Sequence, residues 1–283
     1  MSSRGPAEED LDEVEQHRMP LLDHLKELRY RLLVSAAALG VSLCVSLAFV
    51  SDILEFLKAP VTVALAEVNK SGGLTILTPF EGIQVWLNVA FIGAGVLASP
   101  VVAYQIWAFI APGLYSSERK VVLPLALSST ALFLGGAAFA YEVMFPFAFP
   151  FFFSVVDADV TLSIQGYLSS ITKMLIAFGV CFQLPIGTFF LARTGLIDHR
   201  DMMRAFRYSF VGIFLVAAII TPPDPLSQLI VAAPLTILYG VSIVVAWAFH
   251  HQGGDSRAYR SRSTPPRAAR PRAAPPARAT SRP

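Results

Sequence analysis

The sequence predicts an all-α membrane protein with six transmembrane helices. Of its 283 residues, 54% are hydrophobic and only 15% are charged, whereas soluble domains carry about 25% charged residues. Uncharged stretches also recur along the chain, and about 20 residues suffice for a helix to cross the hydrocarbon core. These stretches cover 32–50, 82–117, 121–141, 174–192, 208–223 and 225–249.

The distribution of positive charge predicts how these helices are oriented. Lys and Arg gather on the cytoplasmic side of membrane proteins. With the amino terminus placed in the cytoplasm, 19 of the 22 Lys and Arg residues fall on that side. The remaining three are Lys58, Lys70 and Lys173. We therefore expect both termini to be cytoplasmic.

The first fifty residues are predicted to form three successive segments: a disordered segment, an interfacial helix and the first span. Residues 1–18 are acidic and poor in apolar side chains, a composition typical of disorder. From Met19 to Arg31, leucines recur at helical spacing, which predicts a short amphipathic helix at the membrane interface. This helix leads into the first span, over about 32–50. The first apolar run follows some thirty polar residues, so we expect no cleavable signal peptide.

Prolines lie before, within and after the next two predicted spans. The segment 51–80 on the outer side is predicted to form an amphipathic helix that Pro60 interrupts. The second span, about 82–109, contains Pro100, so we expect a kink or a break there. The third span, about 121–145, is expected to end in the run of phenylalanine and proline at 145–153.

The last three spans complete a membrane domain over residues 19–250. The fourth covers about 170–191, and the fifth and sixth, about 207–221 and 226–249, form a tight hairpin. The uncharged stretch of the fifth has 16 residues, or about 24 Å of helix, which is shorter than the bilayer core. The Arg-, Pro- and Ala-rich tail 251–283 is predicted to be disordered and cytoplasmic. Its arginines either bind anionic lipid, at about 1 kcal/mol each, or remain solvated.

What the sequence lacks argues against two functional classes. No Lys, Arg, Asp or Glu lies deep in a predicted span, whereas ion-coupled transporters keep ionisable groups there. The HExxH, GxSxG and P-loop motifs are absent, as is any Cys/His cluster with metal-ligand spacing. Cys44 and Cys181 are expected to be buried and unpaired. We therefore expect no enzymatic activity, cofactor, metal or nucleic-acid partner.

Among the amides that enter the spans, Gln183 and Gln228 are candidate contacts within the membrane. Such amides usually hydrogen-bond to a neighbouring helix of the same protein, at about 0.6 kcal/mol each. Gln183 differs because it lies mid-span, directly before Leu184 and Pro185. The proline frees a backbone carbonyl, and freed backbone must face protein or water. Gln183 is therefore a candidate contact for a partner helix, and internal bonding is the alternative.

Two carboxylates on the cytoplasmic side, Glu27 and Glu118, are the candidate ligand-binding groups. Each lies just outside an apolar run and has arginine close by. Acidic residues on a basic membrane face suit a cationic ligand. The alternative for Glu27 is an ion pair with Arg31 in its own helix, worth about 0.2–0.5 kcal/mol. The alternative for Glu118 is a loop acid that pairs with Arg119.

Several motifs in a fixed order carry a resemblance to a known family. Before the first span stands His-Leu-Lys-Glu-Leu-Arg at 24–29, and the second span ends in Tyr-Gln-Ile-Trp-Ala-Phe-Ile-Ala-Pro-Gly-Leu-Tyr at 104–115, followed by Glu-Arg at 118–119. Phe-Gln-Leu-Pro at 182–185 and Thr-Pro-Pro-Asp at 221–224, with Ser-Gln at 227–228, follow further along. From about residue 21 to 249 the chain closely resembles the TatC family, the multispanning core subunits of the twin-arginine protein translocase.

The resemblance implies a fold and a function. It implies six helices packed around a concave face, in the bacterial cytoplasmic (inner) membrane. It also implies binding of signal peptides that carry paired arginines. Glu27 and Glu118 correspond to the acidic residues of that site, Arg29 supports it, and Phe109 belongs to the surface nearby. Adjacent arginines can engage both acids only if these lie closer than about 20 Å, roughly six extended residues.

The resemblance also implies partner contacts inside and outside the membrane. Family members assemble with single-span proteins of the TatA and TatB kind and associate with themselves. Pro60 resembles the family's outer-loop proline, and Asp224 its acidic residue in the last outer turn. Gln183 stands where many members carry Glu, which argues against a titratable buried acid in this chain. Two other functions stay open, a secondary transporter and a scaffold that organises single-span partners without binding signal peptides.

Overall fold

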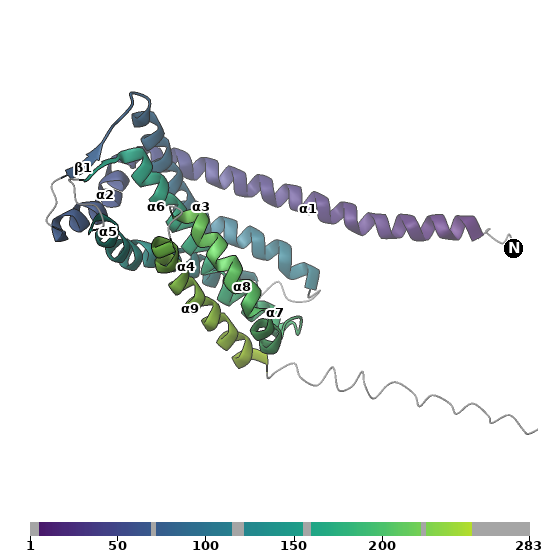
Figure 1. Cartoon of the computed structure of the whole chain (residues 1–283). Coiled ribbons are helices and arrows are strands. Elements are labelled where there is room, and N and C mark those ends of the chain that lie inside the picture. Colours follow the sequence, from purple (N-terminus) through teal and green to yellow (C-terminus); the bar gives the residue numbers. More distant parts are fainter. Residues whose placement is uncertain (1–5, 69–71, 115–121, 155–159, 222–224, 251–283) are drawn as a thin grey trace, which may run out of the picture.

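The computed structural model describes residues 6–68, 72–114, 122–154, 160–221 and 225–250. It is an elongated helical bundle with a small two-stranded sheet at one end (Figure 1). In chain order the elements are α1 (Pro6–Ala48), α2 (Val50–Glu67), β1 (Gly72–Thr75), α3 (Glu81–Leu114), α4 (Val122–Phe139), the π-helical segment η2 (Ala140–Met144), α5 (Phe145–Ser154), β2 (Val160–Ser163), α6 (Ile164–Cys181), α7 (Leu184–Arg193), α8 (His199–Ile220) and α9 (Pro225–His250).

Within the described residues, six helical segments are long and apolar enough to span a membrane. They are 24–48 of α1, 81–110 of α3, 122–154 across α4 to α5, 164–193 across α6 and α7, α8, and 225–249 of α9. The predicted number of spans is confirmed. α1 packs chiefly against α3, and α9 packs against α7 and α8, so the first helix lies at one edge of the bundle and projects beyond it (Figure 1).

α1 is longer than the sequence predicts. It begins at Pro6 and continues to Ala48 without a break, although disorder is expected through residue 18 and a separate interfacial helix from Met19. Glu, Leu and Gln, which favour helix, are frequent in this stretch. Each further residue also adds a hydrogen bond to a helix that has already formed. The predicted tail 251–283 lies outside the described residues.

The prolines of α2 and α3 do not break their helices. Pro60 lies inside α2 and Pro100 inside α3. A proline leaves the carbonyl four residues earlier without its usual N–H partner. Hydroxyl groups take that place here, because Tyr141 donates to the carbonyl of Phe56 at 2.7 Å and Ser99 donates to that of Val96 at 2.8 Å.

The third span also continues where proline was expected to end it. After α4 the chain widens into the π-helical turn η2 and continues as α5 to Ser154. Such a turn adds one residue to the helical repeat. Pro146 follows it as the second residue of α5, which also continues through Pro150. Phe145, Phe149 and Phe153 then stack along one buried face of α5.

One end of the bundle carries a two-stranded sheet that the sequence analysis did not predict. β1 and β2 pair in parallel from Gly72 with Val160 to Thr75 with Ser163. β2 leads directly into α6, and β1 leads into α3 through residues 76–80. Their hydrogen bonds therefore fix the amino-terminal ends of two spanning segments against each other, next to α2 and α5 (Figure 1).

The fourth and fifth spans differ from the prediction in their boundaries. α6 begins at Ile164 and the helix is interrupted between Cys181 and Leu184, around Gln183. α8 begins at His199, so its first two turns carry Arg200 and Arg204 before the apolar part starts. The cysteines are free, as expected, but Cys44 is exposed and Cys181 only half-buried. An exposed cysteine suits a helix surface that faces lipid.

Candidate functional site

The part of α1 around Glu27 binds to α3 through a polar chain of three side chains. The Arg31 guanidinium donates from Nε to Oε1 of Glu27 at 3.0 Å. Its Nη1 group donates to Oε1 of Gln105 on α3 at 3.3 Å. The ion pair within α1, which the sequence offered as the alternative for Glu27, is therefore present. Arg31 nevertheless does more than neutralise Glu27, because it connects that carboxylate to the second span.

An aromatic contact lies one turn from this polar chain. The rings of His24 and Phe109 stack with centroids 4.4 Å apart and an interplanar angle of 20°. His24 precedes Glu27 by one helical turn, and Phe109 follows Gln105 by one turn, so both contacts lie along the same α1–α3 seam. The structure thus brings Glu27 and Phe109, two of the predicted site residues, into one surface.

The exposure of these groups determines what else they can bind. The Glu27 side chain is 38% exposed and that of Arg31 is 19% exposed, so solvent or a ligand can reach the carboxylate. Arg31 occupies Oε1 through both of its contacts with Glu27. Arg29 is exposed on the same helix. Glu118 lies outside the described residues, so its distance from Glu27 stays a prediction.

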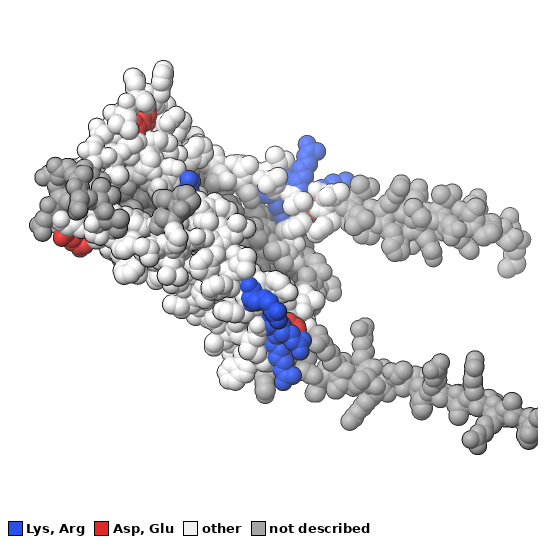
Figure 2. Space-filling model, viewed as in Figure 1, with Lys and Arg blue, Asp and Glu red and all other residues white. Residues whose placement is uncertain are grey.

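Positive charge dominates this end of the molecule. Figure 2 shows Lys and Arg gathered over α1 and over the start of α8, well away from the sheet. Near the α1–α3 seam, α1 carries Lys26, Arg29 and Arg31 beside Glu27. With Glu27 paired to Arg31, these residues carry a net positive charge. A cationic ligand at this surface must therefore be held by direct contact with a carboxylate rather than by the net charge.

Gln183 lies at the break between α6 and α7 and has internal partners at both ends of its amide. Its Nε2 group donates to the carbonyl of Ser129 at 3.1 Å and to that of Gly179 at 3.4 Å, and its Oε1 accepts from the Ser129 hydroxyl. The Gln183 backbone N–H bonds to Val180 at 2.9 Å, which leaves the Gly179 carbonyl to the side chain. The amide thus repairs the break and ties it to α4. Its role toward a partner stays a prediction.

The other predicted contact residues have local structural roles or lie outside the described residues. Pro60 is buried in α2, and the carbonyl it frees is bonded by Tyr141. Gln228 donates from Nε2 to the carbonyl of Phe214 at 2.7 Å and so joins α9 to α8. Asp224 lies in the turn 222–224, outside the described residues.

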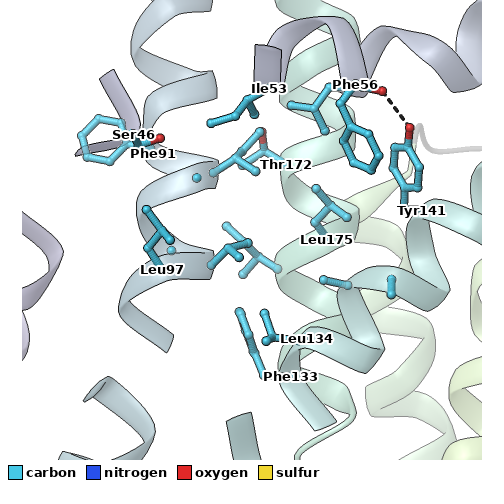
Figure 3. A pocket seen from close by; sticks show the side chains of 18 of the residues that line it. Ser46, Ile53, Phe56, Phe91, Leu97, Phe133, Leu134, Tyr141, Thr172 and Leu175 are labelled. Carbon is cyan, nitrogen blue, oxygen red and sulfur yellow. Dashed lines mark hydrogen bonds between the residues drawn. The ribbon is translucent and has the colours of Figure 1, made fainter. Parts of the chain in front are cut away.

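A deep apolar pocket lies between α1, α2, α3, α4 and α6. Its volume is about 580 Å³. Figure 3 shows Ile53 and Phe56 of α2, Phe133 and Leu134 of α4, and Leu175 of α6 around it, with the Tyr141–Phe56 hydrogen bond at one end. A cavity of this size and composition suits an apolar ligand.

Sequence reasoning missed two features of this chain. Gln105 is the residue through which α1 and α3 join at the candidate site, and its only signal was its position as an amide inside a span. Glu81, the first residue of α3, is 3% exposed and accepts hydrogen bonds from the backbone of Leu77 at 2.6 Å and Gln165 at 3.0 Å, and from the Ser163 hydroxyl. An acid in the first turn of a helix was its signal.

Comparison with known proteins agrees with this architecture. Residues 23–234 match the family described as Sec-independent protein translocase protein (TatC). A protein of that name from Helicobacter pylori is 42% identical over 229 residues, which cover 80% of this chain and 88% of the relative. Protein TatCy from Bacillus subtilis is 36% identical over 247 residues, 86% of this chain and 94% of the relative.

A solved structure shares the fold as well. The crystal structure titled twin arginine translocase receptor TatC superimposes with a TM-score of 0.70 at 35% identity, and the match covers 80% of this chain and 99% of the solved one. A second structure with that title, determined in DDM, gives a TM-score of 0.72 at 34% identity. The six apolar helices, the family match and these relatives together show that the chain is a multi-pass membrane protein of the TatC family of protein translocase components.

Proposed function

We propose that this protein is the receptor subunit that binds twin-arginine signal peptides at the cytoplasmic end of the α1–α3 seam. The observation that carries the proposal is the convergence of Glu27, Gln105 and Phe109 on one surface through Arg31 and His24. A carboxylate that is fixed in position, half open to solvent and flanked by an aromatic ring can receive a planar guanidinium.

The chemistry of the carboxylate accounts for a preference for arginine. A guanidinium binds a carboxylate through two parallel hydrogen bonds, whereas a lysine ammonium offers a point charge. Arg31 already donates two hydrogen bonds to Oε1 of Glu27, so Oε2 is the oxygen open to a ligand. The parallel pair of hydrogen bonds forms when the guanidinium of the ligand displaces Arg31 from Oε1. The first arginine of the pair binds there and the second binds Glu118. Arg31 is thus a positioning residue, because it holds Glu27 against Gln105.

The apolar segment of the signal peptide then extends into the membrane domain. The pocket of Figure 3 is the apolar surface suited to it, with Gln183 at the α6–α7 break further along α6. The proposal includes a location in the bacterial cytoplasmic membrane with both termini in the cytoplasm, which the basic groups at the α1 and α8 end support. It includes partners of the TatA and TatB kind and self-association through exposed apolar helix faces.

Site-directed photocrosslinking tests the receptor function. A photoreactive residue at position 109 in membranes is expected to capture a signal peptide with Arg-Arg at least tenfold more than its Lys-Lys version, because two charge-assisted contacts change. Glu27→Gln is expected to lower capture of the Arg-Arg peptide by a similar factor. Glu55→Gln, an exposed acid on α2, is the matched control. Equal capture of both peptides would leave the protein as a scaffold for other subunits.

A further inference from the structure

An exposed lysine lies over an apolar groove between α6 and α8. The groove has a volume of about 290 Å³ and is lined by Thr172, Lys173, Ile176 and Ala177 of α6 and by Val216, Ile219 and Ile220 of α8. The Thr172 hydroxyl donates to the carbonyl of Leu168 at 2.7 Å. Lys173 is therefore the one charged group of a groove whose other walls are almost entirely apolar.

The position of Lys173 relative to the membrane surface follows from its neighbours at the end of α8. Ile219 and Ile220 share the groove with Lys173 and are the last two residues of α8. The uncharged part of α8 begins at Tyr208, so it spans 13 residues, or about 20 Å, against about 30 Å of hydrocarbon. A short hairpin draws the bilayer surface toward its own end. The outer lipid headgroups thus lie close to the level of Lys173.

Lys173 has no anionic partner within the described part of the chain. A charged residue at the edge of the hydrocarbon is costly unless it reaches an anion or water. A lysine in this position lays its methylene stem along apolar surface and extends the ammonium to the headgroups. The groove supplies the apolar surface, and the anion must come from outside the chain.

We propose that this groove binds an anionic phospholipid of the outer leaflet, with the phosphate at Lys173 and one acyl chain between α6 and α8. The chemistry requires an amphiphile with one negative head and one apolar tail, since the groove offers one cation at its rim and apolar walls below. A phospholipid in the leaflet at that depth meets both requirements. This site is separate from the α1–α3 seam and does not depend on signal-peptide binding.

Native mass spectrometry of the full chain in detergent tests the site. Phosphatidylglycerol is expected to bind about fivefold more tightly than phosphatidylcholine, which corresponds to about 1 kcal/mol for one lysine near the surface. Lys173→Gln is expected to abolish that preference, and Lys173→Arg to retain it. Lys58→Gln, another lysine on the outer side, is the matched control and is expected to leave the preference unchanged.

A second variant tests the tail. Val216→Trp fills the groove from α8 and is expected to lower the retention of both lipids severalfold, while Val211→Trp, an exposed site on the same helix that does not line the groove, is expected to leave both unchanged. Monodisperse elution on gel filtration establishes that each variant is folded. Equal binding of the two lipids by the unmodified protein, or the same loss in Lys58→Gln as in Lys173→Gln, would overturn the proposal.

Discussion

The hydroxyl of Tyr141 donates a 2.7 Å hydrogen bond to the backbone carbonyl of Phe56, the carbonyl that Pro60 leaves without a helical partner. The two rings also stack, with centroids 4.2 Å apart. A residue in the π-helical turn of the third span thus compensates for a proline in the helix that follows the first span. This contact accounts for an unbroken α2 and encloses one end of the apolar pocket (Figure 3).

Tyr141→Phe is expected to lower the free energy of unfolding by about 0.6 kcal/mol, the average for side-chain hydrogen bonds between membrane helices, and by no more than about 1.7 kcal/mol. The ring contact with Phe56 stays in this variant. In a Pro60→Ala background the new N–H of residue 60 bonds the Phe56 carbonyl, so the cost of Tyr141→Phe is expected to fall toward zero. Denaturant unfolding in detergent micelles measures the free energy of unfolding of the unmodified protein, the two single variants and the double variant. An equal cost in both backgrounds would show that the hydroxyl contributes nothing through this carbonyl.

The crossing of α1 and α3 depends on a glycine. A Cβ atom at Gly93 would lie 2.2 Å from Oγ of Ser46 and 2.8 Å from Cδ1 of Ile53. Gly93→Ala is therefore expected to cost about 1–3 kcal/mol of stability through overpacking. A Cβ at Gly95, two residues along the same helix, meets nothing within 4 Å, so Gly95→Ala is expected to be neutral or stabilising by up to about 1 kcal/mol. Melting curves of the two purified variants check this contrast.

A partial rescue adds a second test of the same crossing. Ser46→Ala removes the hydroxyl that lies closest to a new methyl group at position 93. The double variant is expected to recover part of the stability lost in Gly93→Ala, because Ile53 still crowds the site. No recovery would mean that Ser46 is not the limiting contact.

Gln183 offers a way to separate internal packing from partner binding. Gln183→Leu removes its hydrogen bonds to Ser129 and Gly179, with an expected cost of about 1 kcal/mol. Ser129→Ala removes only the hydrogen bond from the Ser129 hydroxyl to Gln183. This variant is the control for a loss of stability that leaves the Gln183 side chain in place. We expect Gln183→Leu to reduce copurification of single-span partners, Ser129→Ala to leave it unchanged, and Gln183→Glu to be tolerated. If the two destabilised variants lose partners in proportion to their stability, Gln183 acts through packing alone.

Glu81 is expected to hold the two-stranded sheet to the bundle. Its carboxylate accepts from the backbone of Leu77 and Gln165 and from the Ser163 hydroxyl, and so joins the segments that precede α3 and α6. Glu81→Gln places an amide N–H₂ where donors already point and is expected to lower the melting temperature clearly. Glu67→Gln, an exposed acid at the end of α2, is expected to have no measurable effect. Hydrogen exchange at Thr75 and Leu162 locates the change.

The spans were predictable because the length and polarity of a segment are enough to decide whether it can cross a bilayer. Any stretch of about 20 apolar residues without charge can cross it, whatever the rest of the fold does. The ends of the helices were less predictable, and so was the effect of the prolines, because both depend on contacts with distant segments. Whether Pro60, Pro100 or Pro146 ends a helix depends on which groups lie near the carbonyl it frees, and these groups come from distant segments such as Tyr141.

The candidate site was predictable in part. Glu27, Arg31 and Phe109 were visible as residues, and the i to i+4 spacing revealed the ion pair within α1. The role of Gln105 was hidden, because an amide inside a span has no fixed direction in sequence. The stack of His24 on Phe109 was hidden too, since a ring contact between residues 85 positions apart has no local pattern.

The sequence by itself determined that this protein lies in a lipid bilayer and how many spans it has. It also determined which segments are basic and which motifs the chain shares with its family. These are properties of composition and local order, and they follow from the cost of placing charge and unpaired backbone in hydrocarbon. Only the tertiary structure decided which partners Arg31, Gln183 and Glu81 have, and where the apolar pocket and the groove between α6 and α8 lie. Those depend on packing, which brings together side chains that the sequence keeps far apart.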